Sequence, residues 1–143
     1  MNYSFQEESA MDLRSLRFLV LWPHKSQVED CLLDSDFESG TKHFSVRDEN
    51  NEIVACCSVM QEEREIDDQV YSCRLRAMAA HPSIRRMGMS KQLLKFVEEV
   101  FPGKNFWCDA REIAVPFYLS CGWQIQSEPY QIPIIGTHYL MTK

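Results

Sequence analysis

Hydrophobic and polar positions change their spacing along the chain, and these changes predict the order of the elements. Residues 3–7 alternate as an edge strand does, whereas the apolar residues within 11–21 recur with a helical period, and Pro23 ends that helix. Residues 43–47 alternate, and residues 53–60 form the nearly continuous apolar run of a central strand. The polar stretch between these two strands is typical of a turn, so we predict a hairpin.

The second half of the chain alternates strands with helices. A polar loop over 62–68 precedes a long predicted strand over 70–80, and residues 88–101 carry their apolar positions on one helical face. Further predictions are a helical piece at 28–33, strands at 106–110, 123–127 and 138–141, a short helix at 112–120 and a loop at 128–137. We see no repeat or linker, so the order indicates one mixed α/β domain over residues 1–143.

Length and composition fit an ordinary globular protein. The chain has 143 residues, of which 45% are hydrophobic and 25% charged, and its net charge is −6. The acidic balance argues against a protein that coats nucleic acid, because that function needs a basic surface. No apolar stretch approaches the ~18 residues of a membrane span, and the first residues lack the regions of a signal peptide. We therefore expect no nucleic acid partner and no membrane partner.

Six cysteines raise the question of disulfides or a metal site. A chain of this length can build a hydrophobic core without disulfides, and no two cysteines have the Cys-x-x-Cys spacing of a zinc site. We expect reduced thiols that pack as small apolar side chains, no metal, and a cytoplasmic protein. The cysteines are Cys31, Cys56, Cys57, Cys73, Cys108 and Cys121.

Basic residues gather in one segment despite the acidic background. Residues 71–95 contain no acidic side chain and six basic ones: Arg74, Arg76, Arg85, Arg86, Lys91 and Lys95. The segment reads as a strand, a turn and the start of a helix, and a helix N-terminus offers unpaired amides and a positive dipole end. It is therefore a candidate site for an anion such as a diphosphate.

Two small residues stand where this helix begins. Gly88 removes the side chain where a phosphate would approach the backbone, and Ser90 keeps its side chain small. An ordinary helix start with a solvated basic surface remains the alternative. The Gly-x-Gly-x-x-Gly pattern of nicotinamide sites and the Gly-x-x-x-x-Gly-Lys pattern of phosphate loops are both absent.

The spacing Arg85-x-x-Gly88-x-Ser90 resembles the Arg/Gln-x-x-Gly-x-Gly/Ala signature of the GNAT family of N-acetyltransferases. Residues 75–82 are similar to that family's fourth strand and the His-Pro turn after it. Residues 110–123 resemble its Ala-x-x-Phe-Tyr-x-x-x-Gly-Phe motif. The resemblance covers residues 40–143, and the N-terminal helix with Leu13, Leu16 and Arg17 is similar to the small bacterial ElaA-like branch.

Three positions depart from the family pattern. Ser90 replaces the usual glycine or alanine but is still small. Arg111 stands where many members have asparagine, so it would contact a phosphate or a pantetheine carbonyl in place of the usual bond. Pro116 lies inside the short helix and removes a backbone donor, so that helix should bend or begin late.

The resemblance implies a single domain with a central, mostly antiparallel twisted sheet and helices on both faces. It also implies acetyl-CoA as co-substrate, with the diphosphate on the amides of residues 86–90 and the pantetheine along the strand edge at residues 78–80. The cofactor-binding residues that it implies are Met78, Ala79, Ala80, Arg85, Arg86, Met87, Gly88, Met89, Ser90, Lys91, Arg111 and Tyr118.

The same resemblance implies direct acetyl transfer to an amine within a ternary complex, with Tyr118 as the general acid for the CoA thiolate. A non-catalytic acyl-CoA sensor or partner-binding module on the same fold is the alternative. The general base is left open among a water chain and five side chains. Those side chains are His43, Glu62, Glu63, Cys73 and His138.

Two segments are candidates for the acceptor side. Residues 26–41 hold five acidic side chains and no basic one, which indicates either a solvated loop or a mouth that attracts a cationic amine. Residues 128–136 are apolar and contain two prolines, so they either cover the acceptor or form a homodimer contact. We expect a small-molecule or peptide amine as acceptor.

Overall fold

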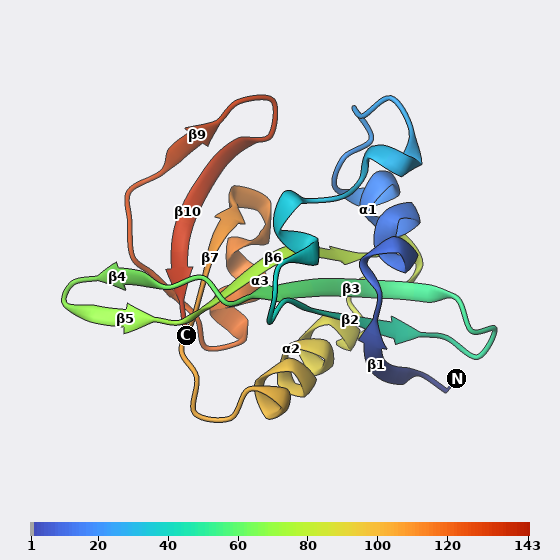
Figure 1. Cartoon of the computed structure of the whole chain (residues 1–143), viewed down its shortest axis with the longest axis horizontal. Helices are drawn as coiled ribbons and strands as arrows, with labels where there is room; N and C mark the ends of the chain where they lie inside the picture. Colours follow the sequence, from blue (N-terminus) through green and yellow to red (C-terminus); the bar gives the residue numbers. More distant parts are fainter. Residues whose placement is uncertain (1) are drawn as a thin grey trace. The chain divides into compact units, whose positions relative to one another are not determined.

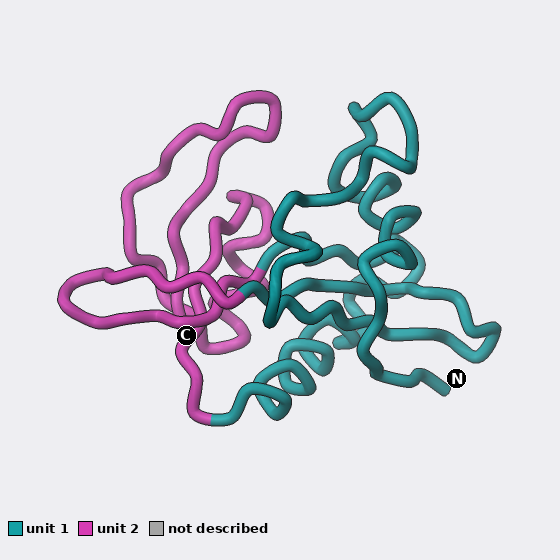
Figure 2. The backbone as a smooth tube through the Cα atoms, viewed as in Figure 1, with its two compact units in different colours: residues 1–60, 76–102 teal, residues 61–75, 103–143 magenta. Residues whose placement is uncertain are grey.

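The computed structural model describes residues 2–143 and divides the chain into two compact units, each made of two stretches of sequence (Figure 2). Unit 1 comprises Met1–Met60 and Arg76–Pro102, and unit 2 comprises Gln61–Leu75 and Gly103–Lys143. The strand β6 (Cys73–Ala80) belongs to both, because the boundary at residues 75–76 falls inside it.

Unit 1 is an antiparallel sheet with two helices (Figure 1). Its strands run in the order β1-β2-β3-β6, so β1 is the predicted edge strand, and β2 and β3 form the predicted hairpin. The elements are β1 (Ser4–Glu8), η1 (Ala10–Leu13), α1 (Arg14–Val20), η2 (Val28–Asp30), η3 (Asp34–Phe37), β2 (Lys42–Arg47), β3 (Ile53–Met60), η4 (Pro82–Ile84) and α2 (Met89–Val100). The predicted first helix is therefore a 3-10 turn, η1, followed by the shorter α-helix α1.

The two helices of unit 1 cover opposite faces of its sheet, because neighbouring residues of β3 point in opposite directions. Cys56 packs in a cluster with Leu13 and Leu16, on the side of α1. Cys57 is paired in register with Phe44, whose ring centroid lies 6.0 Å from that of Phe96 in α2. Figure 1 shows α1 and α2 on either side of β2 and β3, as the resemblance implies for this fold.

A bulge interrupts the part of β6 that lies in unit 1. Ala77 has a φ of 53°, a left-handed conformation that is costly for any residue but glycine. Arg76 bonds to Ser35 of η3, and Ala79 packs in the cluster of Cys56 below α1. Arg76 and Ala79, three positions apart, therefore point to the same face of the sheet. In an unbroken strand, where side chains alternate with a period of two, they would point to opposite faces.

Unit 2 is built on β7, which pairs in parallel with the start of β6 and antiparallel with β10. The strand order is β6-β7-β10-β8, and β9 also pairs with β10. The elements are β4 (Arg64–Ile66), β5 (Gln69–Tyr71), β7 (Phe106–Arg111), η5 (Glu112–Ala114), α3 (Val115–Ser120), β8 (Gln124–Ile125), β9 (Tyr130–Ile132) and β10 (Gly136–Thr142). The α-helix begins only at Val115, so the late start predicted from Pro116 is confirmed.

Three sequence predictions in unit 2 are wrong. The polar segment 62–68 is not all loop, because β4 forms there and pairs with β5. The predicted strand over 70–80 is broken at Ser72, and the predicted loop over 128–137 contains β9. β4, β5 and β9 are only three residues long, too short for a repeating pattern. Pairing and packing against the rest of the unit stabilise these strands. Such contacts cannot be predicted from the local sequence alone.

Candidate functional site

The segment that leads into α2 is shaped by a tight turn. His81 caps the turn η4, since its Nδ1 accepts a hydrogen bond of 3.1 Å from the amide of Ser83. The amide of Met87 then donates to the carbonyl of Ile84 over 3.3 Å. The predicted His-Pro turn is thus present, and it delivers the chain to the start of α2.

Gly88 occupies the N-cap position of α2 and has a φ of +79°, where other residues are strained. No side chain caps the helix, and its first turn contains no acidic residue. The first amides of a helix have no partner within it. A Cβ built on Gly88 would meet no atom within 4 Å apart from its chain neighbours and the helix backbone, so the described residues do not crowd this position.

Basic side chains surround this helix start. Arg85, Arg86 and Lys91 are all exposed, and Arg85 donates from Nε to the carbonyl of Ala80 over 3.3 Å. Arg86 has a φ of 67°, a second left-handed residue within three positions of Gly88. Strained residues persist only where the surrounding structure determines them, and they cluster at ligand sites. The arrangement is chemically suited to a diphosphate.

The strand that precedes the turn contributes its backbone. Ala79 is 3% exposed and packs on the cluster below α1, so its side chain is not available to a ligand. Met78 and Ala80 are half-buried, and the bulge at Ala77 lies just before them. All the predicted cofactor residues from Met78 to Lys91 thus belong to unit 1, within one strand-turn-helix segment.

The two other predicted residues belong to unit 2. Tyr118 lies in α3, is 5% exposed, and its ring centroid is 5.3 Å from Phe117 and 5.2 Å from Trp123. Arg111 ends β7 and stands at the N-cap of η5, and burial lowers the pKa of its guanidinium. Six residues lie between Arg111 and Tyr118, namely the 3-10 turn η5 and the first half of α3.

Unit 2 also holds a polar cluster that the sequence did not reveal. Asp109 accepts hydrogen bonds from Tyr130 and from Nη2 of Arg74, the latter over 2.8 Å. Arg74 also bonds to the carboxylate of Glu62, and its Cζ lies 4.6 Å from the ring centroid of Trp107. Burial and the bond to Asp109 raise the pKa of Tyr130. Arg74 was noted as part of the basic segment, but nothing near Asp109 in the sequence marked it as a partner.

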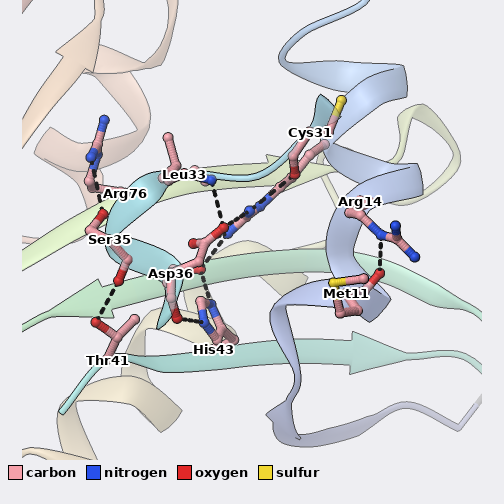
Figure 3. Close-up of polar contacts among 12 residues, drawn as sticks. Met11, Arg14, Cys31, Leu33, Ser35, Asp36, Thr41, His43 and Arg76 are labelled. Atoms are coloured by element: carbon pink, nitrogen blue, oxygen red, sulfur yellow. Dashed lines mark hydrogen bonds and ion pairs between the residues drawn. The ribbon is translucent and has the colours of Figure 1, made fainter. Parts of the chain in front are cut away.

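Unit 1 contains a second cluster, which is buried and holds η3 in place (Figure 3). Arg17 donates to Asp36 over 2.6 and 3.0 Å and to Ser58 over 2.9 Å, and neither charged side chain is exposed. His43 lies between Asp36 and Ser58, at 3.0 Å from the carbonyl of Asp36 and 2.6 Å from Oγ of Ser58. Both ring nitrogens of His43 are thus occupied.

The described residues show neither a metal cluster nor a membrane-spanning helix. Residues 2–143 contain no group of three or more His, Cys, Asp or Glu side chains that could hold a metal ion. Within the same residues, no helix is long and apolar enough to cross a membrane. The six cysteines are buried and unbonded to one another, and burial raises the pKa of Cys56 to about 12.

Comparison with known proteins places the chain among acyltransferases. An uncharacterized N-acetyltransferase of Bacillus subtilis strain 168, YitI, is 28% identical over 138 residues, which cover 94% of this chain and 91% of that protein. Two solved structures share the fold. Escherichia coli ElaA has a TM-score of 0.77 at 19% identity, covering 99% of both chains. An aminoglycoside 6'-N-acetyltransferase complexed with coenzyme A has a TM-score of 0.74 at 13% identity, covering all of this chain and 96% of the other.

A family model decides the assignment. The model described as the acetyltransferase (GNAT) family matches residues 7–123, which is most of the chain and includes both blocks of the sequence resemblance. The likeness to ElaA is one of fold, so membership of the ElaA-like branch stays a prediction. The chain belongs to the acetyltransferase (GNAT) family and is an acyl-CoA-dependent N-acetyltransferase.

Proposed function

We propose that this protein transfers an acetyl group from acetyl-CoA directly to an amine that is bound at the same time. The observation that carries the proposal is the start of α2, where an uncapped glycine in a left-handed conformation opens the helix between exposed cations. Bare amides and a positive helix end favour a dianionic diphosphate, and arginines can bind its oxygens bidentately.

The residues that would hold the CoA part follow from this placement. Of the amides of residues 86–90, that of Met87 is bonded to the carbonyl of Ile84, and the others would face the diphosphate, while Arg85, Arg86 and Lys91 add charge. The uncapped start of α2 and its left-handed glycine support the fit. Arg111 would contact a phosphate or a pantetheine carbonyl, and its partial burial suits a fixed position better than a solvated one.

The bulge at Ala77 supports the placement of the pantetheine. A bulge leaves backbone groups without their ladder partners, so Met78–Ala80 can offer them to the amides of a pantetheine arm. The burial of Ala79 agrees with this, because the contact then uses its backbone and not its side chain.

Two proton transfers set the chemistry. An alkyl amine with a pKa near ~10.4 is mostly protonated at pH 7, so forming the neutral nucleophile costs about 4.6 kcal/mol unless the site helps. The departing thiolate, with a thiol pKa of ~8.5 by analogy with cysteine, needs a proton. We assign that proton to the hydroxyl of Tyr118, which lies in the matched motif and is held by aromatic neighbours.

The acceptor is a small-molecule or peptide amine. The first-half segment 26–41 keeps its acidic side chains Glu29, Asp30, Asp34 and Glu38 exposed, which favours attraction of a cationic amine. Asp36, by contrast, is bonded to Arg17 and takes no part in that attraction. The segment 128–136 keeps Ile134 85% exposed, and its use as an acceptor cover or a homodimer contact stays a prediction.

Thermal shift followed by a thiol-release assay tests the proposal. Acetyl-CoA and CoA should raise the Tm, NAD should not, and a panel of amines should identify one that releases CoA. Tyr118→Phe should lower kcat at least about ten-fold, or about 1.4 kcal/mol, while CoA still raises the Tm. An unchanged kcat removes Tyr118 as the acid. CoA binding without thiol release from any amine would instead favour a non-catalytic acyl-CoA sensor.

A further inference from the structure

His138 has an imidazole whose proton position is fixed by its backbone neighbour. Its Nδ1 lies 2.7 Å from the carbonyl oxygen of Gly136, and a carbonyl oxygen can only accept. Nδ1 therefore carries the hydrogen, and Nε2 of the neutral ring presents a lone pair. A ring held in one tautomer by a second group is the arrangement that a general base requires.

The surroundings of His138 hold the ring in place. The side chain is 4% exposed, and the ring stacks on Tyr130 with an angle of 27° and a centroid distance of 6.2 Å. Within residues 2–143, the buried side-chain atoms that lack a partner are Arg17 Nε, Ser45 Oγ and Arg74 Nε. His138 Nε2 is not among them, and no hydrogen bond to it is found within these residues.

His138 also stands next to the predicted site residues of its unit. It is the register partner of Arg111 across β7 and β10, so the two side chains lie side by side on one face. The segment that begins at Arg111 continues through η5, which contacts β10, into α3 with Tyr118. The imidazole and the predicted cofactor contact thus share one face of β7 and β10, and the predicted acid lies further along the segment that begins at Arg111.

The structure weakens three of the other candidates for the base. Both ring nitrogens of His43 are engaged, by Asp36 and by Ser58. The carboxylate of Glu62 is bonded to Arg74, and Cys73 is fully buried. Asp109, which the sequence did not suggest, shares its carboxylate between Arg74 and Tyr130. A lone pair that is already engaged is a poor acceptor for a substrate proton.

We propose that His138 is the general base that takes the proton from the acceptor amine; this rests on the proposed acetyl transfer. Nε2 of His138 takes one proton from the ammonium form of the acceptor, and the neutral amine nitrogen then bonds to the thioester carbonyl carbon. The carbon–sulfur bond breaks, and the sulfur takes a proton from Tyr118. The second proton that the nitrogen gives up passes through water to the tyrosinate. The products are an N-substituted acetamide and CoA, and the imidazolium then releases its proton to the solvent.

Two variants separate the base from a structural role. His138→Asn keeps an N–H near the position of Nδ1, so it can still donate to Gly136, but it has no basic nitrogen. His138→Ala loses both. With an alkyl amine, kcat/KM should fall about 100-fold or more for each, the range expected of general base catalysis. His24→Asn, an exposed histidine in unit 1, is the matched control and should change nothing.

The pKa of the acceptor supplies the decisive readout. Hydroxylamine is already neutral at pH 7, so transfer to it should fall less than about ten-fold in His138→Asn. Added imidazole should restore transfer to the alkyl amine in His138→Ala. An equal loss with both acceptors, or no loss with either, overturns His138 as the base. If the unaltered protein releases no CoA with any amine while CoA binds, the proposed transfer itself has failed.

Discussion

Each unit joins an arginine to an aspartate, but the two pairs differ in their access to water. In unit 1, Arg17 and Asp36 have 0% of their side chains exposed and bond through both guanidinium ends. In unit 2, Arg74 and Asp109 are 19% and 20% exposed, and the carboxylate is shared with Tyr130. The first pair connects α1 to η3, and the second connects the start of β6 to β7.

This difference in access to water indicates different roles: the buried pair stabilises the fold, whereas the pair in unit 2 is also accessible to ligands. Removing water from two charges is costly, so a dry pair survives only where further bonds complete it. Ser58, the carbonyl of Cys31 and the amide of Leu33 provide those bonds in unit 1. The pair in unit 2 keeps contact with solvent, so a substrate or a water molecule can reach it. The buried pair should therefore govern stability, and the partly buried pair should contribute less to it.

The largest expected effect comes from breaking the buried pair. Asp36→Ala leaves the Arg17 guanidinium buried without its carboxylate, which should destabilise the fold by about 3–5 kcal/mol. Urea unfolding of both proteins measures the difference. Asp34→Ala, in the same 3-10 turn but exposed, should cost less than about 0.5 kcal/mol. A cost for Asp36→Ala no larger than that of the control would contradict the comparison.

Acid should remove the same contribution. Burial alone would raise the pKa of Asp36, but the bonds from Arg17 and the amide of Leu33 outweigh it and hold that pKa below its ordinary value. A lowered folded-state pKa gives stability that is full above the unfolded value of ~3.9 and lost as the pH falls through the folded value. The stability gap between the native protein and Asp36→Ala should thus be constant at pH 5–7 and narrow below about pH 4. A gap that does not change down to pH 2 would contradict this.

A smaller effect is expected in unit 2. Tyr130→Phe removes one hydrogen bond to Asp109, which keeps Arg74 and access to water, so the loss should be about 1 kcal/mol. Asp109→Asn, which still offers an oxygen to Tyr130, is the matched comparison for that bond. Thermal unfolding reports the cost. A loss as large as that for Asp36→Ala would mean that the cluster in unit 2 is structural as well.

Much of the fold follows from periodicity. The alternation of β2, the apolar run of β3 and the helical period of α2 extend over enough residues to be read directly. The uncapped start of α2 also agrees with the prediction, because glycine at residue 88 and the basic residues beside it are local features.

The remaining features depend on distant residues. Strand β4 is held by Arg64, whose guanidinium lies 5.1 Å from the ring centroid of Trp107, and by Ile66 in the cluster beneath it. The turn after β4 uses Asp67 and Asp68 with φ of 49° and 66°, where a sequence reader expects glycine or asparagine. The partnership of Arg17 with Asp36 spans 19 positions, and neither residue stands out from its neighbours. No local pattern could have revealed these contacts.

The extra residue at Ala77 shifts the alternation of side chains along β6 by one position. Arg76 and Ala79 lie three positions apart, yet Arg76 bonds to Ser35 and Ala79 packs in the cluster of Cys56 below α1. Deleting this single alanine would restore an unbroken alternation along the strand. Ala79 would then point away from the cluster that it fills. Changes of length at this point should therefore be tolerated far less well than exchanges of one side chain for another.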